Sequence, residues 1–173
     1  MTARPPWARS IDEILAAARG RLLRLTPQHA WRELAEGAVL IDIRPAAQRA
    51  AEGEIPGSAI VERNHLEWRL DPGCDARLPW VTGYDHRVIV ICHEGYTSSL
   101  AAAVLHDLGL RRATDVIGGF RAWTAAGLPS APAPCRHAGT TSRAGPAPVR
   151  GGSARLPASR VPAWLLAGVA AGR

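Results

Sequence analysis

The apolar residues among the first 130 positions occur either in short runs or at the spacing of one face of a helix. Two of the runs, residues 38–43 (AVLIDI) and 87–91 (RVIVI), are short and rich in β-branched side chains. Such runs predict strands that are buried on both faces, as in a parallel sheet. Weaker patterns of the same kind predict short strands near residues 58–61 and 114–117.

Helical patterns lie between these strands. Ser10 and Glu13 match a capping box, and Thr26 followed by Pro27 is a second typical helix start. The predicted helices cover residues 10–19, 26–37, 98–108 and 120–127, with one helical turn near residues 65–69. Strands that alternate with helices predict an α/β fold, in which helices flank a central and mostly parallel sheet.

The composition changes near residue 130, where aliphatic periodicity ends and Ala, Pro, Gly, Ser and Arg dominate. We expect this part to be a disordered tail. The chain contains no Lys; residues 1–131 hold fifteen Arg and fifteen Asp or Glu, whereas the remainder holds six Arg and no acid. The predicted organisation is an N-terminal extension with a short helix, a single folded domain and a tail, at residues 1–21, 22–131 and 132–173.

Charge and cysteine content exclude several classes of protein. The excess arginines of the tail are dispersed and have one Trp among them, so no nucleic-acid partner is expected. Cys74, Cys92 and Cys135 have no disulfide or zinc-site spacing. The first ten residues lack the apolar core of a signal peptide, and the apolar run at 163–171 is shorter than the roughly 20 residues that span a bilayer. We therefore expect no membrane span and a reducing, cytoplasmic environment.

Cys92 is the main candidate for chemistry because it follows the clearest strand, and a helix begins a few residues later. In parallel sheets, ligands bind at the carboxyl ends of the strands. The intervening loop, whose turn Gly95 permits, can aim backbone N–H groups at an anion, and Ser98 is the expected N-cap of the helix. Both the N–H groups and the helix dipole favour a thiolate. The alternative is that Cys92 is only a small buried apolar residue.

Four segments, in this order, resemble the family of rhodanese-like sulfurtransferases. They are LIDIRP at 40–45, GEIPGSAIV at 53–61, the Cys92 loop CHEGYTS, and DVIGGFRAW at 115–123. The resemblance covers roughly residues 25–129. It implies a small three-layer α/β fold and a catalytic Cys92 that carries a sulfane sulfur as a persulfide. It also implies that neither a metal nor an organic cofactor is needed.

The resemblance further implies a sulfur donor, such as thiosulfate, and a thiol or cyanide acceptor, with a sulfur-accepting protein as a further candidate partner. Asp42 and Arg44 are expected to brace the loop. The candidate substrate-binding residues are Arg63, His93, Glu94, Gly95, Tyr96, Thr97 and Ser98. Arg63 is preferred to Arg69 because it lies nearer to a predicted strand end.

Glu94 departs from the pattern of the family, in which many members have a basic residue in the loop. A carboxylate beside the sulfur disfavours the thiolate and repels thiosulfate, unless it points outward. Two other roles are open to Glu94: it can pair with an arginine, or it can orient an acceptor thiol.

Two other classes of function remain open. A cysteine phosphatase or arsenate reductase is disfavoured, because position six after Cys92 is Ser98 and not the arginine that binds the oxyanion. A non-catalytic rhodanese-like module, which carries sulfur, senses it or binds a partner, is the alternative to an enzyme.

Overall fold

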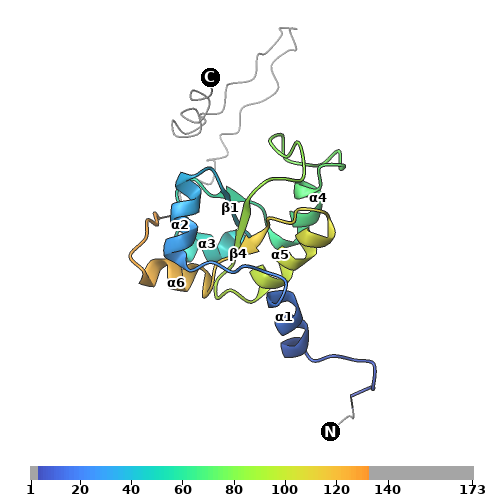
Figure 1. Cartoon of the computed structure of the whole chain (residues 1–173). Coiled ribbons are helices and arrows are strands. Elements are labelled where there is room, and N and C mark those ends of the chain that lie inside the picture. Colours follow the sequence, from blue (N-terminus) through green and yellow to red (C-terminus); the bar gives the residue numbers. More distant parts are fainter. Residues whose placement is uncertain (1–3, 133–173) are drawn as a thin grey trace, which may run out of the picture. The chain divides into compact units, whose positions relative to one another are not determined.

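The computed structural model describes residues 4–132. Its centre is a parallel sheet of four strands in the order β2-β1-β3-β4 (Figure 1). The strands are β1 (Val39–Asp42), β2 (Ala59–Ile60), β3 (Val88–Ile91) and β4 (Thr114–Asp115). Every residue of β3 is buried, as expected for a central strand that is covered on both faces.

Helices cover both faces of this sheet. They are α1 (Ile11–Arg19), α2 (Pro27–Ala35), α3 (Ala46–Glu52), α4 (Leu66–Leu70), α5 (Thr97–Asp107) and α6 (Gly119–Ala125), with a short 3₁₀ helix at Arg63–His65. α2 packs against α6, whereas α1 and α4 both pack against α5 (Figure 1). The predicted three-layer α/β fold is therefore confirmed.

Two apolar clusters fill the spaces between the layers. Alternate residues of a strand point to opposite faces. Val88, Val90 and Cys92 accordingly join the cluster that contains α4 and α5. Ile89 and Ile91 join the cluster that contains α2 and α6. The sulfur-bearing side chain of Cys92 thus lies on the α5 side of the sheet.

Most of the predicted elements form close to their expected positions. Ser10 makes the predicted capping box with Glu13, and Thr26 caps α2. The helix at Ala46–Glu52 was not predicted, although its alanines favour one. One expectation was wrong. Ser98 is not an N-cap, because α5 begins at Thr97 and the Ser98 side chain turns into the protein instead.

No helix within residues 4–132 is both long and apolar enough to cross a membrane. The predicted tail, together with Cys135 and the apolar run at 163–171, lies outside the described residues.

Candidate functional site

The site lies where two neighbouring parallel strands end. Asp42 at the end of β1 pairs in register with Ile91 at the end of β3. The next residue is Cys92, and a loop of residues 92–96 leads directly into α5. The carboxyl ends of these strands and the N-terminus of α5 therefore meet around the Cys92 sulfur, as expected from the sequence.

The Cys92 sulfur is buried and faces three polar groups. The backbone N–H groups of Gly95 and Ser98 donate to Sγ at 3.2 and 3.4 Å. The thiol itself lies 3.2 Å from Ser98 Oγ, to which it donates. Gly95 has φ +79°, a left-handed conformation that glycine adopts without strain and that curls the loop around the sulfur. The two backbone donors form a cradle for a negatively charged sulfur, whereas the Ser98 hydroxyl gives its own proton to Asp115.

The first turn of α6 holds the loop from one side. Phe120 N–H donates to the Cys92 carbonyl at 2.8 Å, and Arg121 N–H donates to the His93 carbonyl at 3.1 Å. Gly119 brings the two segments this close, because a Cβ at this position would lie 2.5 Å from the Cys92 carbonyl oxygen. The second glycine of the GGFRAW motif thus lets the Cys92 loop approach the first turn of α6 closely.

A buried charge network that we did not predict lies beneath the loop. The Asp115 carboxylate accepts hydrogen bonds from Ser98 Oγ at 3.1 Å and from Ser99 Oγ at 2.7 Å. Arg24 pairs with the same carboxylate through Nε at 2.8 Å. A signal for this network existed in the sequence, because Asp115 lies within the predicted strand at 114–117. A buried carboxylate in a strand requires a charged or hydrogen-bonding partner.

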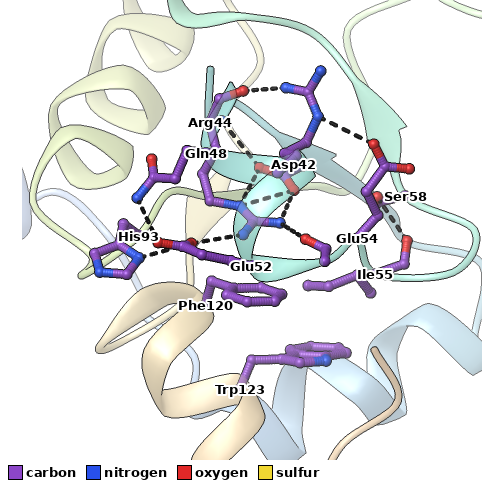
Figure 2. Close-up of polar contacts among 12 residues, drawn as sticks. Asp42, Arg44, Gln48, Glu52, Glu54, Ile55, Ser58, His93, Phe120 and Trp123 are labelled. Atoms are coloured by element: carbon purple, nitrogen blue, oxygen red, sulfur yellow. Dashed lines mark hydrogen bonds and ion pairs between the residues drawn. The ribbon is translucent and has the colours of Figure 1, made fainter. Parts of the chain in front are cut away.

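Asp42 and Arg44 form a second buried network at the end of β1 (Figure 2). Arg44 Nη2 lies 2.7 Å from Asp42 Oδ2, and both side chains are fully buried. The same guanidinium donates to the Gly53 carbonyl and lies 3.6 Å from the centroid of the Phe120 ring. Since Phe120 N–H also binds the Cys92 carbonyl, this geometry favours the bracing role that was expected for Asp42 and Arg44.

Glu52 connects this network to the loop. Its Oε2 lies 3.1 Å from both Arg44 Nη1 and His93 Nδ1 (Figure 2). Burial alone would raise the pKa of the Glu52 carboxyl. Hydrogen bonds from Gln48 and Arg44, and the charge of a protonated His93, outweigh burial, so the pKa lies below its ordinary value. Glu52 is therefore an anion that orients the His93 ring.

A cavity of about 510 Å³ opens beside the Cys92 sulfur. It gathers most of the predicted substrate-binding residues, whereas Arg69 is not among its lining residues and donates to the Ala76 carbonyl. Thr97 lines the cavity, but its hydroxyl makes none of the hydrogen bonds found among residues 4–132. Those predicted site residues that line the cavity are Arg44, Arg63, Cys92, His93, Glu94, Tyr96 and Thr97.

The arginines at the cavity and the Glu94 carboxylate are ion-paired, whereas the Glu62 carboxylate accepts a backbone N–H, that of Ala46. Glu94 turns toward Arg121, whose Nη1 lies 2.5 Å from its Oε1. Arg63 pairs with Glu67 one helical turn later, at 2.7 Å. Arg121 thus compensates the charge of Glu94, the carboxylate of the loop. In the same way, Glu67 compensates the charge of Arg63, the arginine that was expected to bind the donor.

The described part of the chain contains no cluster of His, Cys, Asp and Glu side chains with which a metal ion could be held. Cys74, the other free cysteine of residues 4–132, does not line the cavity.

The family model described as the rhodanese-like domain matches residues 26–126. Among curated proteins, thiosulfate sulfurtransferase GlpE from Actinobacillus succinogenes is 32% identical over 106 residues, which cover 61% of this chain and 86% of that protein. The GlpE protein of Stutzerimonas stutzeri is 34% identical over 100 residues, which cover 58% of this chain and 83% of the relative.

Solved structures show the same similarity. A Rhodopseudomonas palustris protein of unknown function, described as a possible tyrosine phosphatase, is 31% identical, with a TM-score of 0.67 over 75% of this chain and 100% of that chain. The polysulfide-sulfur transferase of Wolinella succinogenes is 25% identical, with a TM-score of 0.58 over 75% of this chain and 91% of its own.

Proposed function

Because the chain belongs to the rhodanese-like domain family, we propose that it is a sulfurtransferase that moves a sulfane sulfur through a Cys92 persulfide. The observation that carries this proposal is the cradle of the Gly95 and Ser98 backbone N–H groups around a sulfur that borders an open cavity. The relatives named as thiosulfate sulfurtransferases and as a polysulfide-sulfur transferase support it.

The reaction proceeds in two balanced steps. In the first, the Cys92 thiolate attacks the outer sulfur of the donor; a new S–S bond forms, and the old one breaks with its electron pair on the leaving group. For thiosulfate, the leaving group is sulfite. In the second step, cyanide or a thiolate attacks the outer sulfur of the persulfide and becomes thiocyanate or a new persulfide, which restores the Cys92 thiolate. The backbone N–H groups stabilise the anionic sulfur throughout.

The charges around the cavity favour donors of low charge. Arg63 and Arg121 are each compensated by a carboxylate, and Arg44 is compensated by Asp42 and Glu52. Each of these three guanidinium groups already has an anionic partner. None of them is therefore free to pair with a dianion such as thiosulfate. We therefore propose thiosulfate as a usable donor, and organic persulfides or polysulfides as better ones.

Intact mass spectrometry tests the assignment. After treatment with a sulfane-sulfur donor and removal of the excess, the wild-type chain should gain the mass of one sulfur atom. Cys92→Ser should gain none, whereas the matched control Cys74→Ser should behave as the wild type, because Cys74 lies outside the cavity. An extra sulfur that persists in Cys92→Ser would refute the role of Cys92.

The alternative is a non-catalytic rhodanese-like module, which carries or senses sulfur or binds a partner. Turnover separates it from the enzyme: a module forms the persulfide but does not release it repeatedly to cyanide or a small thiol. Steady-state rates with thiosulfate, mercaptopyruvate and an organic persulfide would decide between the two and would rank the donors.

A phosphatase activity, which the description of the Rhodopseudomonas protein raises, is not favoured here. Cysteine phosphatases bind the phosphoryl oxygens with an arginine six residues after the cysteine. In this chain that position is Ser98, whose side chain is buried and committed to Asp115.

The proposal places the reaction in the cytoplasm, where Cys92 stays reduced between turnovers. Its partners are a small-molecule sulfur donor and a thiol or cyanide acceptor.

A further inference from the structure

The carbonyl oxygen of Gly95, at the tip of the loop, accepts hydrogen bonds from two arginine side chains. Arg19 Nη2 donates at 2.9 Å and Arg24 Nη2 at 3.1 Å. A carbonyl oxygen has two lone pairs, so two cationic donors saturate it and hold it firmly. Both arginines precede residue 26 and lie outside the part that matches the family model.

Two local structures bring these arginines under the loop. Arg19 is the last residue of α1, which packs against α5. Nε of Arg19 donates to Ser99 Oγ at 3.3 Å. The guanidinium carbon of Arg19 lies 5.3 Å from the centroid of the Tyr96 ring. Arg24 precedes Leu25, whose backbone N–H donates to the Asp115 carbonyl beside β4. The N-terminal segment is therefore in direct contact with the loop that contains the reactive sulfur.

The planar peptide between residues 95 and 96 links this contact to the chemistry. In a trans peptide, the C=O and N–H bonds point in opposite directions. With the Gly95 oxygen held against the arginines, the Tyr96 N–H must point away from them. This N–H makes none of the hydrogen bonds found among residues 4–132, and Tyr96 lines the cavity. The preceding N–H, of Gly95, already meets the Cys92 sulfur.

We propose that Arg19 and Arg24 are positioning residues, which hold the Gly95 carbonyl so that the Tyr96 N–H donates to the outer sulfur of a Cys92 persulfide. The inner sulfur stays with the N–H groups of Gly95 and Ser98. The outer sulfur keeps its negative charge while the electron pair of the broken S–S bond departs with the leaving group, so an N–H aimed at the outer sulfur stabilises that charge as the atom is transferred to Cys92. This inference rests on the proposed function.

Arg19 is the position to test, because removing Arg24 would leave the buried Asp115 without its charged partner and endanger folding. Arg21 provides a matched control. It also joins the end of α1 to α5, through a pair with Asp107, but it makes no contact with the loop. The variants are Arg19→Ala, Arg21→Ala and Arg19→Lys, the last of which keeps a cationic donor.

Single-turnover persulfide formation is measured over a range of donor concentrations. In Arg19→Ala we expect the rate at saturating donor to fall about tenfold. This is less than the hundredfold typical of deleting such a donor outright, because Arg24 still holds the Gly95 carbonyl. The donor concentration for half-saturation should change little, since the aimed N–H acts on the transition state. Arg21→Ala should stay within about twofold of the wild type, and Arg19→Lys should recover most of the loss.

Amide NMR spectra before and after persulfidation give a direct readout. The Tyr96 amide proton should move downfield in the wild type and in Arg21→Ala, and much less in Arg19→Ala. Equal rates in the two alanine variants, or a wild-type Tyr96 signal that does not respond to persulfidation, would overturn the inference. If Arg19→Ala does not fold, the wild-type signal and Arg19→Lys decide. A wild type that forms no persulfide refutes the proposed function instead.

Discussion

Gly119 offers the sharpest test of how the loop is held. A Cβ at this position would lie 2.5 Å from the Cys92 carbonyl oxygen and 2.6 Å from that of His93, whereas ordinary van der Waals contact begins at 3.4 Å. Both neighbours are backbone atoms, so no flexible side chain can turn aside. Gly119→Ala must therefore push the loop away from the turn by most of an ångström, or distort the turn itself.

The size of the effect follows from two contributions. Gly119 has φ +59°, and an alanine in such a conformation costs about 1 kcal/mol. Overpacking against the two carbonyls adds about 1–3 kcal/mol. We therefore expect the free energy of unfolding to fall by about 2–4 kcal/mol. Because a displacement near 1 Å costs up to about a hundredfold in rate, sulfur transfer should fall by about ten- to a hundredfold.

Gly127→Ala is the matched control. Its φ is +67°, nearly the same, but nothing lies within 4 Å of the added Cβ. Urea unfolding should show a loss of about 1 kcal/mol in this variant, from backbone strain alone, and sulfur transfer should be unchanged. If the two variants lose the same stability and keep the same activity, the close contact between Gly119 and the loop is not what positions the sulfur.

Two further predictions concern charge. Glu94→Lys places a cation at the cavity and releases Arg121, so kcat/KM for thiosulfate should rise about fivefold relative to kcat/KM for an organic persulfide. Added salt should remove this advantage. The control is Glu33→Lys, which should show no such preference, because the Glu33 carboxylate pairs with Arg87 before β3. The lowered pKa of Glu52 stabilises the fold above the ordinary value of 4.5, and this contribution disappears as the pH falls through the lowered pKa. The difference in unfolding free energy between wild type and Glu52→Gln should therefore be full at neutral pH and vanish in acid; a pH-independent difference would contradict the role of that charge.

The sheet could be predicted because its signals are local and redundant. Residues 38–41 and 88–91 are apolar throughout, and a strand buried on both faces suits short, β-branched runs of that kind. The place of Cys92 followed directly, since parallel strands that are adjacent end at the same edge. The capping pairs of α1 and α2 were equally readable, because a cap depends on residues only three positions apart.

Features that depend on long-range contacts were not readable in the same way. Ser98 has the composition of an N-cap, yet its hydroxyl lies between the Cys92 sulfur and Asp115, a residue 17 positions later. The pairing of Glu94 with Arg121 crosses 27 positions. The effect of Glu94 on a donor anion therefore depends on a partner that sequence reasoning could not assign.

The loop is held from two opposite sides, and this bears on how donors are selected. The first turn of α6 binds the carbonyls of Cys92 and His93, while Arg19 and Arg24 bind the carbonyl of Gly95. With three of its carbonyls committed outward, the loop can offer its N–H groups to the sulfur without rearranging when a donor arrives. A preorganised anion cradle stabilises any anionic outer sulfur alike, so it cannot distinguish one donor from another. Selection must then come from the rest of the donor molecule, which meets the paired charges and the apolar surface of the cavity.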